Sequence, residues 1–210
     1  MKRVLVKLVG GIPAGILISI GGTALLCCSD KVVGALLFTI ALVTICYKGY
    51  YLFTGKVGYL AERCKKDDVE SILLGLLGNT IGAVGCGFLL SYAIGGIQES
   101  AYVICSAKLL QSHPVALIRG IFCGILMYVA VSVFKENGKN VLGIMIGIPA
   151  FILSGFEHSI ADLYYFAVSG IVDGRAFIFI LVVILGNAIG GMLLPFFSKV
   201  KLKKEEKIEQ

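Results

Sequence analysis

Long apolar blocks alternate with short polar segments along this chain. A helical bilayer crossing takes about 20 mainly apolar residues, so the pattern predicts six membrane spans. The second and fifth blocks are too long for one straight crossing, and each contains a polar interruption. The predicted spans are residues 8–28, 33–62, 70–96, 115–134, 141–171 and 175–197.

The interruption in the fifth block is the stretch Gly155–Asp162 (GFEHSIAD), which carries Glu157, His158 and Asp162. Ionisable groups near the middle of a span are costly unless they are paired or face a water-filled cavity. A helix can break at that depth only where the freed backbone is buried in protein or lines a cavity. We therefore expect spans two and five to break at mid-membrane, and the fifth-span break to be the functional site.

Composition agrees with a membrane protein. The chain has 210 residues, of which 58% are hydrophobic and 15% charged, and its mean hydropathy is +0.93. A soluble domain is about half apolar and a quarter charged, so the class predicted is an all-α multi-pass membrane protein. The net charge of +6 comes from basic residues at span ends, which contact lipid headgroups and do not indicate nucleic-acid binding.

The basic residues also predict the orientation. With the N-terminus inside, fourteen Lys and Arg fall on inner segments and four on outer ones. Cytoplasmic segments carry the excess of Lys and Arg, so both termini are expected in the cytoplasm, with the protein in the cell (inner) membrane. We expect a single transmembrane domain over residues 1–210, with a surface helix or loop at Gln98–Pro114 and a cytoplasmic tail at 198–210.

The two halves of the domain, residues 1–96 and 97–197, repeat each other. Gly11–Leu17 (GIPAGIL) matches Gly120–Leu126 (GIFCGIL), and Leu77–Gly82 (LGNTIG) matches Leu185–Gly190 (LGNAIG), at offsets of 109 and 108 residues. Three spans per half is an odd number, which places the halves in the membrane in opposite directions. Inverted repeats with broken helices build the substrate path of many transport proteins.

Both interruptions combine a Phe, a hydrogen-bonding residue and a Gly, in Leu52–Gly55 (LFTG) and in Gly155–Asp162. Phenyl rings at a narrow point resist wetting. An imidazole between such rings is driven toward neutrality by desolvation and toward its charged form by an approaching anion. His158 is thus predicted to give a proton to a weak-acid anion or to stabilise the anion in transit. A buried structural histidine is the alternative.

These stretches resemble the formate/nitrite transporter family over essentially Gly10 to Phe197. The matching stretches are Gly155–Asp162, Leu52–Gly55, Gly78–Gly82 (GNTIG) and Gly186–Gly191 (GNAIGG). The resemblance implies an aquaporin-like fold of six spans and a homopentamer with one pore per subunit. It also implies passage of small monovalent anions such as formate, nitrite, lactate or hydrosulfide, and we expect no cofactor and no metal.

Carried over by position, the resemblance makes His158 the central pore histidine, Thr54 the polar residue opposite it and Lys108 a vestibule lysine that attracts anions. Asn79 and Asn187, from the two Gly-Asn motifs, are also expected along the substrate pathway. The expected constriction residues are Phe38, Leu42, Leu52, Phe53, Met127 and Phe151.

The chain departs from the family in three ways. Gly124 stands where the family usually has an asparagine that hydrogen-bonds the pore histidine, and Lys48 and Tyr51 stand where it has a small residue and usually an acid. The family's amphipathic N-terminal helix is reduced to Met1–Lys7. Because an unpaired buried lysine is costly, we expect Lys48 to pair with Glu157 as a structural charge across the two breaks.

Two other functions remain open at this point. A neutral-solute channel of aquaporin type is also built from inverted repeats. However, such a channel carries a pair of Asn-Pro-Ala motifs, and Ile12–Ala14 and Ile148–Ala150 lack the asparagine. A membrane-embedded enzyme would need a ligand set, and His158 and Asp162, four residues apart on one helical face, could share a metal. Asp173–Ala176 (DGRA) is a fragment of a lipid-transferase motif whose second half is missing.

Overall fold

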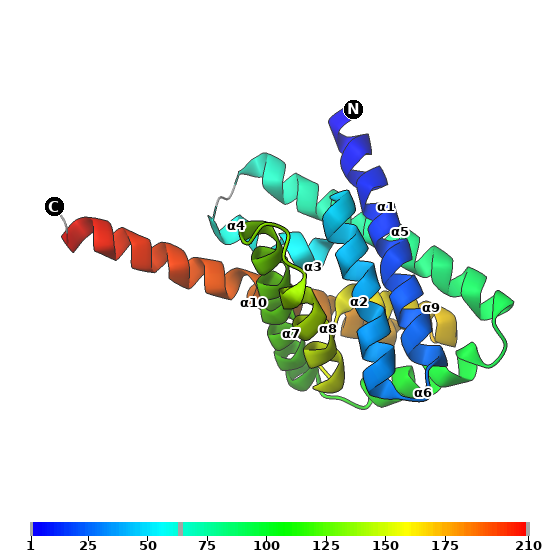
Figure 1. Ribbon diagram of the computed structural model, residues 1–210. Helices are drawn as coiled ribbons and strands as arrows, with labels where there is room; N and C mark the ends of the chain where they lie inside the picture. Colours follow the sequence, from blue (N-terminus) through cyan, green and yellow to red (C-terminus); the bar gives the residue numbers. More distant parts are fainter. Residues whose placement is uncertain (1, 63–64, 209–210) are drawn as a thin grey trace.

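The computed structural model describes residues 2–62 and 65–208, and all regular structure within these residues is α-helical (Figure 1). Arg63, one of the basic residues counted above, and Gln210 at the end of the predicted tail lie outside the described residues. The helices are α1 (Lys2–Cys27), α2 (Lys31–Lys48), α3 (Phe53–Lys56), α4 (Tyr59–Glu62), α5 (Lys66–Ala93), α6 (Ile97–Leu109), α7 (His113–Glu136), α8 (Leu142–Leu153), α9 (Ser159–Ser169) and α10 (Gly174–Ile208).

Five of the described helices are long and apolar enough to cross a membrane. They comprise Leu5–Cys27, Lys31–Lys48, Lys66–Ala93, His113–Glu136 and Gly174–Val200. The remaining predicted span, residues 141–171, consists of α8 and α9, which are separated by the non-helical segment 154–158. The fifth apolar block is therefore interrupted at the position that its polar residues predicted. The predicted surface segment Gln98–Pro114 forms most of α6 and the start of α7.

The break in the second block follows from its local sequence. Asp30 caps α2 by accepting hydrogen bonds from the backbone N–H groups of Val32 and Val33, at 2.7 and 3.1 Å. Gly49 ends the helix in the left-handed conformation, with φ of 71°, which glycine adopts at no steric cost. The chain then runs extended to Leu52, and α3 begins at Phe53. The helix thus resumes inside the predicted interruption LFTG.

The repeated glycine motifs bring helix pairs into close contact. In the bundle α1 packs against α5, while α7 packs against α10, whose C-terminal part extends away from the other helices (Figure 1). A Cβ atom at Gly15 would collide with the carbonyl oxygen of Asn79, and one at Gly124 with that of Asn187. Small residues permit such approach of helix backbones in membranes. The two sequence repeats therefore make the same kind of contact.

Candidate functional site

The amide of Asn79 holds the first break. Its Oδ1 accepts the backbone N–H of Phe53 at 2.8 Å, while its Nδ2 donates to the carbonyl oxygens of Gly11 and Tyr51 at 2.8 and 2.7 Å. Asn79 is fully buried. A helix break exposes backbone polar groups that need partners when water is absent. Asn79 binds two of them, on Tyr51 and Phe53, and ties them to α1 through Gly11.

Asn187 does the same at the second break. Its Oδ1 accepts the backbone N–H of Ser159 at 2.9 Å, and its Nδ2 donates to the carbonyl oxygens of Gly120 and Glu157 at 2.9 and 2.8 Å. Asn187 is also fully buried. The two asparagines lie at matching positions of the sequence repeat, and they bind matching backbone groups.

The two breaks meet at Thr54 and His158. The hydroxyl oxygen of Thr54 lies 2.9 Å from Nε2 of His158, and both side chains are buried. Nδ1 of the same ring accepts the backbone N–H of Ala161 at 3.2 Å, which caps α9. A neutral imidazole whose Nδ1 accepts carries its hydrogen on Nε2. In this arrangement His158 therefore donates to the Thr54 hydroxyl.

Aromatic rings border this pair. The Phe151 ring stacks on the His158 ring, with centroids 5.6 Å apart and planes at 25°. Phe38 meets Phe151 edge to face at 6.2 Å. The other constriction residues predicted from the sequence, Leu42, Leu52, Phe53 and Met127, are all buried as well.

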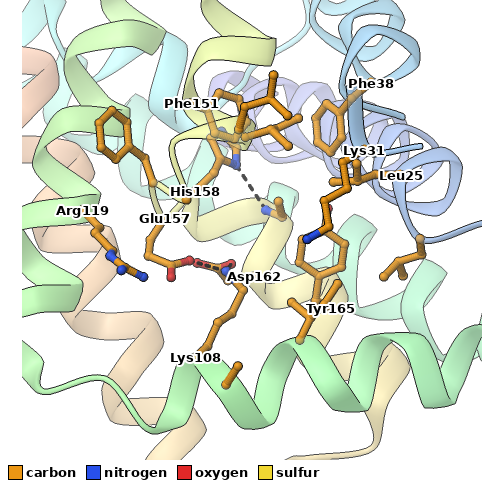
Figure 2. A pocket seen from close by; sticks show the side chains of 18 of the residues that line it. Leu25, Lys31, Phe38, Lys108, Arg119, Phe151, Glu157, His158, Asp162 and Tyr165 are labelled. Atoms are coloured by element: carbon orange, nitrogen blue, oxygen red, sulfur yellow. Dashed lines mark hydrogen bonds and ion pairs between the residues drawn. The ribbon is translucent and has the colours of Figure 1, made fainter. Parts of the chain in front are cut away.

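A cavity of about 560 Å³, here the Lys108 cavity, reaches His158 from one side. Figure 2 shows Lys108 extending from α6 toward Glu157 and Asp162, with Arg119 and Lys31 also on the cavity wall. The Lys108 ammonium is ion-paired with Glu157 and lies 2.9 Å from Oδ1 of Asp162. Burial alone would lower the pKa of Lys108, but the carboxylates of Asp162 and Glu157 outweigh burial and raise it. The two carboxylates therefore favour the charged form of Lys108.

A smaller cavity of about 70 Å³, here the Cys46 cavity, lies at the other end of the same helices. Along α2, Lys31 and Phe38 line the Lys108 cavity, whereas Leu42 and Cys46 line the smaller one. Leu52 and Gly55, on either side of Phe53 and Thr54, also line the Cys46 cavity. The Thr54–His158 pair thus lies between the main parts of the two cavities, in a buried section about one helical turn long.

A family model for formate/nitrite transporters matches residues 2–200 of the chain. The chain belongs to the formate/nitrite transporter family. Together with the five long apolar helices, this membership makes it a multi-pass membrane protein. Its fold is that of solved members of the family. It is similar to a pentameric formate channel with formate bound, with a TM-score of 0.82 at 22% identity over 96% of this chain and 98% of that one.

Curated members of the family are similar to the chain over part of their length. The transporter YwcJ of Bacillus subtilis is 31% identical over 66% of this chain and 59% of its own. The nitrite transporter NirC of Salmonella typhimurium is 30% identical over 63% of this chain and 54% of its own. The chain thus spans little more than half the length of these relatives.

Two predictions about this family member are wrong. Lys48 does not pair with Glu157, because Lys48 is exposed at the end of α2, whereas Glu157 is 2% exposed and is bound by Lys108 and Gln111. Asn79 and Asn187 line neither the Lys108 nor the Cys46 cavity, and their amides are occupied by backbone groups. In this structure they hold the breaks.

The departure at Gly124 concerns helix packing in this structure. A side chain there would meet the α10 backbone at Asn187, while the ring nitrogens of His158 are bound by Thr54 and Ala161. Both ring nitrogens of His158 therefore have partners even though the family's asparagine is missing.

Sequence analysis missed several residues of the site. Gln111 donates from Nε2 to Oε1 of Glu157 at 2.7 Å, and Asp162 shares Lys108 with Glu157. Oδ2 of Asp162 is buried, and no hydrogen-bond partner for it lies among the described residues. The only sequence signal was that an acid within a span needs a cation, and the predicted surface segment, which forms most of α6, holds Lys108.

The same contacts weigh against a metal shared by His158 and Asp162. Asp162 is turned to Lys108, and Nδ1 of His158 is used by the Ala161 N–H. Within residues 2–62 and 65–208 no group of three His, Cys, Asp or Glu side chains could hold a metal ion. The geometry thus gives no support to the enzyme alternative.

Proposed function

We propose that the protein passes small monovalent weak-acid anions, of the size of formate, nitrite, hydrosulfide or lactate, across the cell membrane. The observation that carries the proposal is the buried Thr54–His158 hydrogen bond between the two cavities. Support comes from the names of its relatives, which include a nitrite transporter and a formate channel.

The proposed path begins in the Lys108 cavity. Its wall carries three cationic side chains, Lys31, Lys108 and Arg119, against the two carboxylates of Glu157 and Asp162. An excess of positive charge in a cavity raises the local concentration of anions. The anion then meets the Phe38 and Phe151 rings, where a bare charge would be strongly disfavoured. Passage through this dry section requires that the anion be protonated or that donors replace its hydration.

Thr54 supplies such a donor, and His158 orients it. With Nε2 of His158 donating to the Thr54 hydroxyl, the Thr54 O–H hydrogen remains for an oxygen or sulfur of the passing anion. Beyond the pair, Phe53, Leu52 and Leu42, with Met127, form the remaining apolar section before the Cys46 cavity. These constriction roles, like those of His158, Thr54 and Lys108, are part of the proposal.

The proposed assembly follows the same evidence. The matching contacts of Asn79 and Asn187 support six spans in an inverted 3+3 repeat with halves 1–96 and 97–197. The pentameric formate channel supports a homopentamer with one path per subunit. We further propose that both termini are cytoplasmic, on the distribution of Lys and Arg.

Flux into proteoliposomes tests the function. We expect uptake of formate, nitrite, hydrosulfide or lactate above that of protein-free liposomes, no uptake of divalent sulfate, and no added permeability to glycerol. Permeability to glycerol without uptake of any of the four anions would favour the neutral-solute channel and contradict the proposal.

A further inference from the structure

Two buried carboxyl groups share one ammonium in the wall of the Lys108 cavity. Lys108 is ion-paired with Glu157 and lies 2.9 Å from Oδ1 of Asp162, and the two acids are only 2% and 1% exposed. Both oxygens of Glu157 have partners, because Oε2 faces Lys108 and Oε1 accepts from Gln111. Oδ2 of Asp162 is also buried, but it has no hydrogen-bond partner among the described residues.

The other charged groups of the cavity do not compensate Asp162 directly. Lys31 and Arg119 lie on the same wall (Figure 2), but in the part of the chain that the structure describes neither forms an ion pair with Asp162 or Glu157. Helices α1, α5 and α10 also pack against α9, and their described residues add no charged side chain to this wall. The remaining titratable groups near Asp162 are thiols and a phenol, which are ordinarily uncharged near neutral pH; they are Cys105, Cys123 and Tyr165.

The cluster of Lys108, Glu157 and Asp162 therefore carries one negative charge in excess when both acids are ionised. An uncompensated charge is costly in a buried site, and the acid is usually neutralised by a proton instead. A proton on Oδ2 of Asp162 would bind the one carboxylate oxygen of the cluster that lacks a described partner. It would also remove the repulsion between two like charges held at the same ammonium.

We propose that Asp162 is a proton-binding site whose occupancy sets the affinity of the Lys108 cavity for a small monovalent anion. The inference rests on the proposed function. The proton comes from the water of the cavity and converts the carboxylate to a carboxylic acid, which raises the net charge of the cavity wall by one unit. Proton and anion therefore favour each other's binding, and this coupling is reciprocal. The cavity thus collects an anion and a proton from the same solution, and together they make the neutral weak acid that can cross the dry section.

Asp162→Asn keeps the shape of the side chain and is neutral at every pH. With both termini cytoplasmic, as proposed, the Lys108 cavity faces the outside, so the measurement is the half-saturating external formate concentration of cells that express the protein. A unit charge about 4 Å away in water-like surroundings changes affinity about fivefold. We therefore expect this concentration to be up to about fivefold higher in the wild type than in Asp162→Asn when Asp162 is ionised.

The comparison is made at about pH 8 and about pH 5, a range in which folded proteins are usually most stable. The ratio of wild type to Asp162→Asn should be largest at the higher pH and should fall to about one at the lower, where Asp162 holds its proton. Because both proteins are compared at the same pH, the neutral share of the formate is the same for both. The control is Glu99→Gln, which removes an exposed acid of α6 outside this cavity and should follow the wild type at both pH values.

A ratio of one at both pH values, or a ratio that does not change with pH, would overturn the proton site while leaving wild-type transport intact. Absence of wild-type flux would contradict the proposed function instead. Thermal unfolding in detergent then tests the site without any anion, because a folded state that holds a proton the unfolded chain lacks gains stability as the pH falls. Between the same two pH values the unfolding temperature of the wild type should rise relative to that of Asp162→Asn, and parallel curves would overturn the inference.

Discussion

Oγ1 of Thr54 lies 2.9 Å from Nε2 of His158, and this hydrogen bond joins two helix breaks that are 104 residues apart in the chain. Thr54 is the second residue of α3, and His158 is the N-cap of α9. Both short helices therefore begin at the same point, between the Lys108 and Cys46 cavities. In the proposed function, a solute that passes from one cavity to the other meets these two side chains.

Thr54→Val should reduce flux and stability together. The variant keeps the shape of the side chain but leaves the Nε2–H of His158 buried without an acceptor, at a cost of about 1–3 kcal/mol. Thr54→Ser keeps the hydroxyl and should retain most of the flux. Formate uptake and thermal unfolding of both variants provide the measurement. Equal flux in the valine and serine variants would show that the hydroxyl has no part in passage.

Asn79→Ala and Asn187→Ala should destabilise the protein by similar amounts, on the order of 2 kcal/mol or more, because each removes the partner of two buried backbone groups at a break. The control is Asn137→Ala, whose exposed amide donates only to the carbonyl of Val133 at 3.2 Å. Thermal unfolding in detergent compares the three. A loss at Asn79 or Asn187 no larger than at Asn137 would contradict the assigned role.

The glycine contacts between helices predict a contrast between Gly15 and Gly85. Gly15→Ala should cost about 1–3 kcal/mol, since its new methyl group would meet the α5 backbone at Asn79. Nothing lies within 4 Å of a Cβ at Gly85. Gly85→Ala should therefore be neutral or slightly stabilising, as alanine is the better helix former. A higher unfolding temperature for Gly15→Ala than for Gly85→Ala would refute the close packing of α1 against α5.

Lys108→Met should destabilise the protein by about 3–5 kcal/mol near neutral pH, because it leaves buried carboxylates without their cation. Its stability should rise as the pH falls. The folded variant then binds protons that the unfolded chain does not yet bind, and stability rises with falling pH wherever the folded state binds more protons. The charge-removing variant Lys108→Met/Glu157→Gln/Asp162→Asn should recover part of the loss at neutral pH. A pH-independent loss in Lys108→Met would show that the carboxylates are not the cause.

The position of the second break followed from the sequence, and the family resemblance placed Thr54 opposite His158, but the predicted ion pair of Glu157 was wrong. Polar residues within an apolar block indicate a break because the bilayer offers them no water. Lys48 was predicted as the partner of Glu157 because Lys48 lies in the same apolar block as the first break. In the structure Lys48 is the last residue of α2, directly before the left-handed Gly49, and remains exposed.

The role of the two asparagines depends on tertiary structure. A Gly-Asn motif indicates a polar group in a closely packed helix. However, the backbone groups that Asn79 binds belong to Gly11, Tyr51 and Phe53, and their approach depends on how α1, α5 and the break are arranged. Spacing within one helix carries no information on that arrangement.

The central claim is that the imidazole of His158 lets a weak acid cross the dry section between the two cavities. Formate uptake into proteoliposomes by the wild type and by His158→Asn, corrected for protein-free liposomes at each pH, tests it most directly. The account predicts that wild-type uptake rises as the pH falls, because the neutral share of the acid grows about tenfold per pH unit. It also predicts that His158→Asn, folded to the same extent, loses at least about 90% of the uptake, which corresponds to about 1.4 kcal/mol of barrier. If folded His158→Asn takes up formate as fast as the wild type and with the same pH profile, the account is contradicted.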